Sequence, residues 1–138
     1  MPIDFATLEL TPKPNQYLVC PPAVCIKAQT VHREAPVYPA SVAELVSAFL
    51  GVVGNQARVS TGPSDLASYQ FDFVQRSAIM RYPDTISVKF LPIDAEHTTL
   101  AIYSRSHYGY SDMGVNKARI DSWLDLLNAA LGEHRNPG

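Results

Sequence analysis

The sequence predicts an α+β fold: a two-layer sandwich of an antiparallel sheet of about four strands with two helices on one face. Three patterns indicate it. Apolar residues recur at helical spacing after residue 41, strand-like alternation follows between residues 57 and 106, and a second helical stripe begins near residue 116. The turns between strands are short, so neighbouring strands should pair antiparallel. Each helix has one apolar stripe, and packing both on one face of the sheet buries them.

Composition limits the class of protein. The 138 residues suit one domain, and the hydrophobic fraction of 46% is typical of a globular chain. A net charge of −2 argues against a nucleic-acid binder. We expect no transmembrane segment, because no apolar run reaches about 18 residues, and no secretory signal peptide. The expected location is cytoplasmic if Met1 is the native start, and periplasmic or membrane-anchored if the chain is truncated.

The chain divides into an arm at 1–39, an α+β domain at 40–132 and a frayed tail at 133–138. The arm should run extended and pack on the domain, because its prolines exclude a continuous helix or a central strand. A second interpretation is that the arm docks on a partner. The prolines of this segment are Pro2, Pro12, Pro14, Pro21, Pro22, Pro36 and Pro39.

The first helix has a clear start and end. Ser41 is a natural N-cap and Glu44 follows three residues later, which together predict a capping box. Gly54 and Asn55 tolerate the left-handed conformation that often ends a helix. We therefore expect a helix from about residue 42 to residue 54.

Strand patterns occupy the middle of the chain, with turns expected at 61–64, 83–84 and 92–97. Aromatic residues alternate with polar ones at 69–73, so the polar face, with Gln70 and Asp72, should meet water or the arm. The segment 79–82 is interpreted as a short or bulged strand. The predicted strands are 57–60, 69–73, 79–82, 86–90 and 98–106.

The last helix follows a polar bend. Asn116 is its expected N-cap, Gly114 allows a sharp entry, and Gly132 should end it. The apolar stripe of this helix consists of Ile120, Trp123, Leu124, Leu127 and Leu131.

Two cysteines, Cys20 and Cys25, are separated by four residues that include Pro21 and Pro22. They are interpreted as a disulfide or near-paired thiols on the one hand, and as two unrelated cysteines on the other. A zinc site needs four ligands, and His32 would be only the third. We expect neither a metal nor a cofactor.

Arginines concentrate around the bend before the last helix, and they have two interpretations. They form an anion pocket, helped by free N–H groups at the start of that helix, or they pair internally with carboxylates. Internal pairing is favoured, since Asp84, Asp112 and Asp121 are available as partners. The arginines are Arg76, Arg81, Arg105 and Arg119.

Catalysis is the less favoured interpretation of the same bend. His107, Ser111 and Asp112 lie in one loop, whereas the members of a catalytic triad normally come from separate elements. Ser111 and Asp112 also suit a turn or a helix cap. We therefore expect no catalytic residue, and keep a hydrolase that uses His107 or Asp112 as base as the alternative.

Two motifs carry a family resemblance: Gln75-Arg76-Ser77 with Arg81-Tyr82-Pro83-Asp84, and the run from Tyr103 to Arg119. With Asn15-Gln16-Tyr17-Leu18 and the Cys-Pro-Pro before Cys25, the chain resembles the domain-of-unknown-function family fourteen ninety-nine, in its branch with a proline-rich lead. The resemblance implies no activity. It implies many bacterial relatives, some of them with a membrane segment or lipid anchor that points to the cell envelope.

The sequence thus predicts a non-catalytic domain that binds a partner protein or a small anionic ligand near the junction of the last strand and the last helix. A further alternative is a scaffold subunit of an envelope complex that docks through the N-terminal arm. The expected ligand-binding residues are Arg76, Arg105, Tyr110, Asp112, Asn116 and Arg119.

Overall fold

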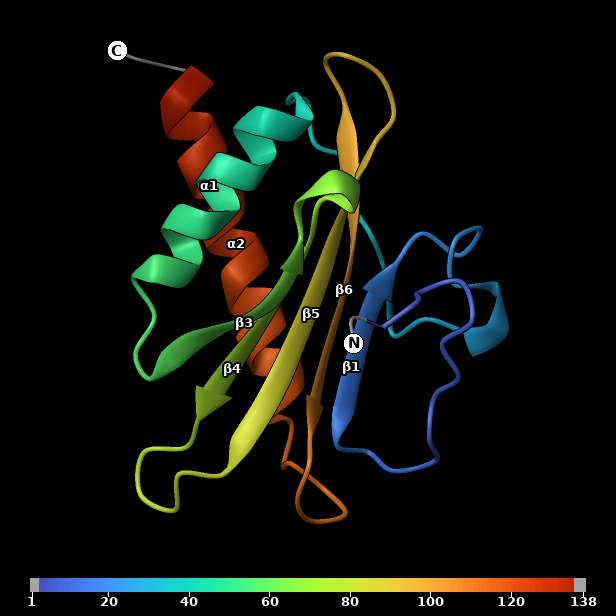
Figure 1. Cartoon of the computed structure of the whole chain (residues 1–138), viewed down its shortest axis with the longest axis vertical. Helices are drawn as coiled ribbons and strands as arrows, with labels where there is room; N and C mark the ends of the chain where they lie inside the picture. Colours follow the sequence, from blue (N-terminus) through green and yellow to red (C-terminus); the bar gives the residue numbers. More distant parts are fainter. Residues whose placement is uncertain (1–2, 136–138) are drawn as a thin grey trace.

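A computed structural model describes residues 3–135, and only the backbone of residues 133–135. Two helices lie on one face of a six-stranded sheet (Figure 1). The predicted α+β class is confirmed. The elements are β1 (Gln16–Cys20), the 3-10 helix η1 (Ile26–Ala28), β2 (Arg33–Glu34), α1 (Val42–Gly54), β3 (Val59–Asp65), the 3-10 helix η2 (Leu66–Ser68), β4 (Gln70–Arg76), β5 (Pro83–Pro92), β6 (Thr98–Ser106) and α2 (Val115–Arg135).

The sheet is mixed and has six strands, so the prediction of about four antiparallel strands is wrong in this detail. Its order is β2-β1-β6-β5-β4-β3, in which β1 and β2 are parallel and the other neighbours antiparallel. Both additional strands come from the proline-rich segment. Proline removes a donor only at its own position, and β1 fits into the proline-free interval between Pro14 and Pro21. It therefore pairs on both sides.

Two strand boundaries also differ from the prediction. The expected turn at 61–64 lies inside β3, where the register with β4 shifts between Thr61 and Ser64. Gly62 and Pro63 fit there because β3 is an edge strand and the irregularity is a bulge. Residues 79–82 form no strand but an exposed loop, and β5 already begins at Pro83.

The main core lies between the sheet and the helices. Phe49 of α1 contacts the rings of Phe73, Phe90 and Trp123, with centroids 5.3–6.2 Å apart. The predicted capping box at the start of α1 is confirmed, since Ser41 and Glu44 bond each other's backbone N–H groups. The buried stripe of α2 is the predicted one: Ile120, Trp123, Leu124, Leu127 and Leu131.

The N-terminal segment covers the other face of the sheet. Phe5 is buried there with Leu18, Tyr103 and neighbouring side chains. Gln70, which was expected to meet water or the arm, is buried and donates from Nε2 to the Ile3 carbonyl at 2.7 Å. The sheet is therefore covered on both faces.

Helix α2 begins at a different cap from the one expected. The Asp112 carboxylate, and not Asn116, accepts from the N–H groups of Gly114 at 2.8 Å and of Asn116 at 3.1 Å. The helix continues past Gly132 to Arg135, and the rest of the expected tail, 136–138, lies outside the described residues. No helix in the described part of the chain is long and apolar enough to span a bilayer.

Candidate functional site

A buried polar network joins the end of β6 to the start of α2. The Asn116 side chain, fully buried, is at its centre. Its Nδ2 donates to the Asn15 carbonyl at 3.1 Å and to Asp112 Oδ2 at 2.6 Å, and its Oδ1 accepts from Ser104 Oγ at 2.5 Å. One amide therefore connects the N-terminal segment, β6, the bend and α2, and it is fully engaged inside the protein.

Arg119 extends this network toward the surface. Its Nη2 donates to Asp84 Oδ2 at 2.8 Å, and its Nη1 to Ser104 Oγ at 3.0 Å and Asn116 Oδ1 at 2.7 Å. Its Nε donates to Gln75 Oε1. The Arg119 side chain is 8% exposed and that of Asp84 is 14% exposed, so this is a nearly buried ion pair. Internal pairing, the favoured interpretation of these arginines, describes Arg119 well.

A groove of about 410 Å³ opens beside this network, between α2, the segment that leads into β3 and the end of β4. Arg58 and Arg76 are exposed there, and they lie close because Arg58 Nε donates to the Arg76 carbonyl at 2.9 Å. Among the described side chains, neither forms an ion pair. We call this the arginine groove; its polar and charged lining residues are Gln56, Arg58, Gln75, Arg76, Ser77, Asp84, Arg119 and Ser122.

Sequence reasoning missed Arg58. It precedes β3 and meets Arg76 only because Val59 pairs with Gln75 in the β3–β4 ladder. The prediction ended the preceding helix correctly but contained no register for this pair of strands. No local pattern around residue 58 marks it as part of a site.

Arg105 lies on the opposite face of the sheet from Arg119. Successive side chains of a strand alternate, and Tyr103 and Arg105 point toward the N-terminal segment while Ser104 points toward α2. Arg105 Nη1 donates to Ser87 Oγ at 2.9 Å and to the Tyr103 carbonyl at 3.2 Å. Burial lowers the pKa of Arg105, opposed by nearby Tyr103 and Asp72. The structure therefore separates it from the other predicted site residues.

The bend at 107–114 is exposed, and Tyr110 projects from it rather than lining the groove. His107 Nε2 lies 2.6 Å from Thr85 Oγ1, and Ser111 Oγ accepts from the Met113 N–H at 3.2 Å. Asp112 binds backbone and amide N–H groups. Within the described residues, His107, Ser111 and Asp112 form no hydrogen bond with one another, so the arrangement is not that of a triad.

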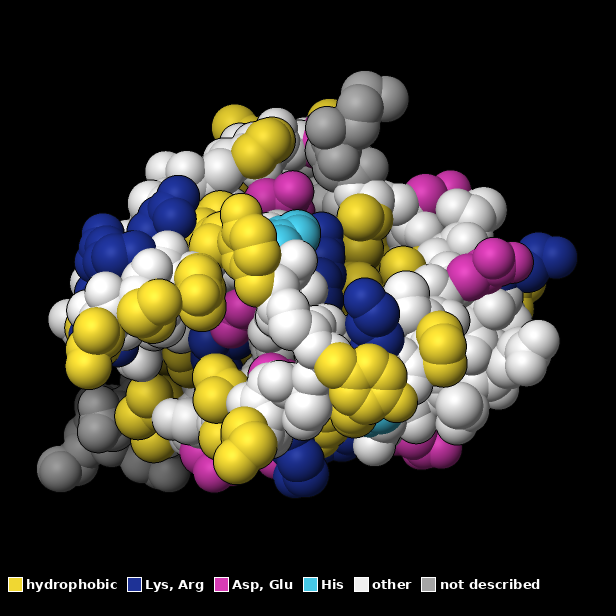
Figure 2. Space-filling view, turned by 90° about the horizontal axis from the view of Figure 1, so that it is seen from below, with side chains coloured by type: hydrophobic (Ala, Val, Ile, Leu, Met, Phe, Trp, Pro, Cys, Tyr) yellow, Lys and Arg dark blue, Asp and Glu magenta, His cyan; other side chains and the backbone are white. Residues whose placement is uncertain are grey.

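Figure 2 views the molecule from the end that carries this bend. Hydrophobic side chains gather over it, with Lys and Arg side chains along one side. The bend at 107–114 and the loop at 77–82 meet here, since the rings of Tyr82 and Tyr108 stack with centroids 5.3 Å apart. Ile79, Met80, Tyr110 and Met113 are exposed near this contact.

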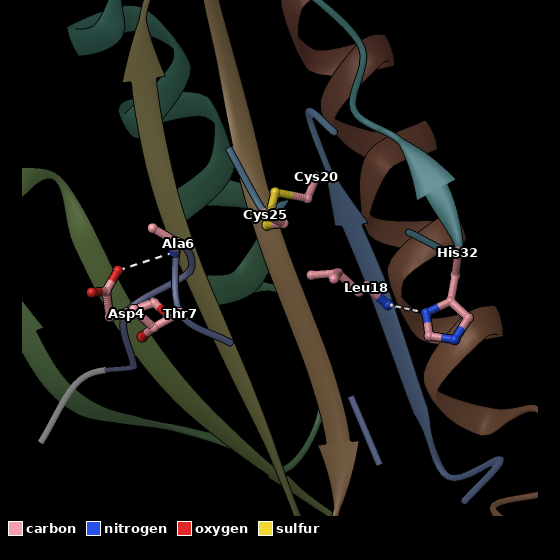
Figure 3. The surroundings of a disulfide bond; sticks show 7 residues. All are labelled: Asp4, Ala6, Thr7, Leu18, Cys20, Cys25 and His32. Atoms are coloured by element: carbon pink, nitrogen blue, oxygen red, sulfur yellow. Dashed lines mark hydrogen bonds between the residues drawn. A yellow bond between two sulfur atoms is a disulfide. The ribbon is translucent and has the colours of Figure 1, made fainter. Parts of the chain in front are cut away.

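A disulfide joins Cys20, the last residue of β1, to Cys25, on the face covered by the N-terminal segment (Figure 3). On the other side of β1, His32 Nδ1 accepts from the Leu18 N–H at 2.9 Å. Both contacts hold the chain that leads from β1 to β2. Across the described residues, no three His, Cys, Asp or Glu side chains gather as a metal site requires.

The fold and the site define a small α+β domain with a buried polar network at the β6–α2 junction and an arginine-lined groove beside it. The chain belongs to the family described as protein of unknown function (DUF1499), whose model matches residues 10–127. The match covers both motifs that carried the resemblance, which is thereby confirmed. None of the curated proteins compared with the chain matches it.

Proposed function

We propose that this domain is a non-catalytic binding module whose arginine groove holds a small anionic ligand. The observation that carries the proposal is an imbalance of charge within one concave surface. Three guanidinium groups line the groove, and Asp84 is the only carboxylate among its described lining residues. Asp84 already pairs with Arg119, so Arg58 and Arg76 add positive charge that nothing described in the groove neutralises.

The groove contains the charged and neutral hydrogen-bond donors that anion-binding sites use. Guanidinium groups donate several N–H bonds in one plane and suit carboxylates and phosphates. Gln56 and Ser77 supply neutral hydrogen-bonding groups on the same surface. The ligand would meet donors held by β4 and α2, with Arg119 already fixed by its bonds to Asp84 and Gln75. A pre-positioned guanidinium loses less conformational freedom on binding.

The N-terminus of α2 takes a different role from the one expected. Asp112 already accepts from the N–H groups of Gly114 and Asn116, so these donors are engaged by the protein's own carboxylate. The proposed ligand therefore depends on side-chain donors. Asp112 and Asn116 act in this proposal as the groups that fix the start of α2, from which Arg119 projects.

Titration with inorganic phosphate and with pyrophosphate, followed by NMR, tests the proposal. We expect shifts of the amide signals of Gln75, Ser77 and Ala118, whose residues line the groove. The double variant Arg58→Gln/Arg76→Gln should lose this binding. Lys13→Gln/Lys27→Gln is the matched control, because it removes the same charge from two exposed lysines outside the groove.

Two results would contradict the proposal. One is a wild-type protein whose groove signals do not respond to either anion. The other is equal binding by the groove variant and the lysine control, which would indicate general charge attraction. Thermal unfolding of both variants should be measured first, since only folded proteins give a meaningful comparison.

A further inference from the structure

Two loops project side by side from one end of the sheet. The loop at 77–82 connects β4 to β5, and the bend at 107–114 connects β6 to α2 (Figure 1). Their tips carry side chains that folding leaves in water: Ile79 is 89% exposed and Met113 is 91% exposed. We call this end the loop-tip surface, and its exposed apolar and aromatic members are Ile79, Met80, Tyr82, Tyr108, Tyr110 and Met113.

The loops that display these side chains are held by bonds of their own. The Ser77 N–H donates to the Tyr82 carbonyl at 3.0 Å, and the Tyr82 N–H to Ser77 Oγ at 3.0 Å. Asn15 Nδ2 donates to the Gly109 carbonyl at 3.0 Å. The Tyr82–Tyr108 stack joins the two loops. The apolar tips are therefore presented together by internally bonded loops.

Arg76, Arg81 and Arg119 lie at this end of the chain's fold and outnumber the carboxylates Asp84 and Asp112 there, although the whole chain carries −2. Arg76 and Arg81 flank the loop tips, and neither forms an ion pair with any described side chain. Both carboxylates have partners within the protein: Asp84 pairs with Arg119, and Asp112, in the bend itself, accepts from N–H groups at the start of α2. Figure 2 shows hydrophobic and basic side chains together on this end.

We propose that the loop-tip surface docks on a lipid bilayer that contains anionic lipid. Apolar side chains at the tips of loops can enter the boundary of the acyl chains, and tyrosine rings favour the headgroup level. Arginines beside them attract anionic headgroups. The positive charge next to an exposed apolar surface is the complement of such a bilayer. The protein then lies on the membrane through its loops, and no spanning helix is involved.

This inference goes beyond the anion groove and is separable from it. The groove depends on the charges of Arg58 and Arg76, which are unpaired among the described side chains, whereas insertion into the bilayer depends on the apolar tips. Removing Ile79 and Met113 should leave phosphate binding in the groove unchanged. The Arg58→Gln/Arg76→Gln variant should keep its apolar insertion and lose only part of its attraction to charged vesicles.

Vesicle co-sedimentation tests the proposal with the full chain. One set of vesicles is phosphatidylcholine alone, and the other adds phosphatidylglycerol. We expect the protein to sediment with the anionic vesicles, and more weakly as salt is raised. Ile79→Ser/Met113→Ser should reduce partitioning by about tenfold or more, because two apolar tips are lost. Ile26→Ser/Leu66→Ser is the matched control, since both residues are exposed but lie outside the loop tips.

The outcomes separate this inference from the proposed function. If neither vesicle composition binds the protein, or if the loop-tip variant and the control bind equally, the bilayer proposal is overturned. Phosphate binding without vesicle binding would support the groove proposal and overturn the bilayer proposal. Vesicle binding by a protein that does not bind phosphate would support the bilayer proposal and overturn the groove proposal.

Discussion

Arg119 and Asp84 form an ion pair of 2.8 Å that connects α2 to the start of β5. Both side chains are nearly buried, so removing one leaves the other charge without its partner in a poorly hydrated place. We predict that Arg119→Ala lowers the free energy of unfolding by about 3–5 kcal/mol. Urea unfolding followed by circular dichroism measures the change.

The control for Arg119 is Lys117 on the same helix. Lys117 Nζ pairs with Asp121 Oδ2 at 2.6 Å, but this lysine is exposed. Ion pairs of this kind add little to stability, and Lys117→Ala should leave the urea midpoint nearly unchanged. Equal losses in the two variants would show that burial does not set the contribution of Arg119.

Tyr38 differs from Arg119 in that its buried polar group is unsatisfied: the hydroxyl has no hydrogen-bond partner among the described residues. Burial raises the pKa of Tyr38 to about 12, since the phenolate would lie in an apolar place. Tyr38→Phe removes the unsatisfied group and keeps the ring. We predict that it raises the free energy of unfolding by about 1 kcal/mol.

Tyr17→Phe provides the comparison for Tyr38. Tyr17 Oη donates to Asp121 Oδ1 at 3.0 Å, so the same substitution removes a bond and should destabilise the protein. Thermal unfolding of both variants is the measurement. A loss of stability in Tyr38→Phe would indicate that its hydroxyl is satisfied in solution.

His32 should make stability depend on pH. Partial burial lowers the pKa of His32 from its ordinary value of 6.5, and its Nδ1 accepts from the Leu18 N–H, which requires the neutral ring. A lowered pKa means that the folded state binds fewer protons than the unfolded chain. The contribution of His32 to the free energy of unfolding is therefore fully present above pH 6.5. It is lost as the pH falls toward the lowered pKa that His32 has in the folded state.

The test compares wild type and His32→Leu by urea unfolding at about pH 7.5 and about pH 5.5. Wild type should lose more stability between the two values than the variant. The other described histidines are present in both proteins and serve as an internal control. An identical pH dependence would show that His32 does not titrate differently in the folded and unfolded states.

The disulfide between Cys20 and Cys25 closes a small loop, with a sequence separation of 5. The chain-entropy model assigns such a loop a stabilisation of about 2 kcal/mol. We predict that Cys20→Ser/Cys25→Ser melts at a lower temperature than oxidised wild type, and that a reductant lowers the melting temperature of wild type only. Mass spectrometry must show that the thiols were released. A fully reduced wild type with an unchanged melting temperature would contradict this prediction.

Local signals predicted the parts of the fold that depend on neighbouring residues. Ser41 and Glu44 are three residues apart, so the start of α1 could be derived from the sequence alone. Strand β1 was missed because the rule about prolines was applied to the whole segment, although the six residues between Pro14 and Pro21 contain no proline. Its partner β6 is distant in sequence, and no local pattern specifies that pairing.

The candidate site shows the same limit. Asp112, Asn116 and Arg119 follow one another closely, and the structure places them in one network. Arg58 joins this region only through the register of β3 with β4. Arg105 lies away from Arg119 because side chains alternate along β6, so that Ile102 and Tyr103 also belong to different core clusters.

The pairing of β1 with β6 has a consequence for biosynthesis. Gln16 leaves the ribosome well before its partner in the ladder, Arg105, which lies far from it in the sequence. Strand β1 can pair early with β2, which follows it closely, but its pairing with β6 must wait until β6 is translated. Non-local pairings of this kind are slow to form. Completion of the sheet therefore depends on the synthesis of β6, and any chaperone that acts before then would meet strand β1 without its β6 partner.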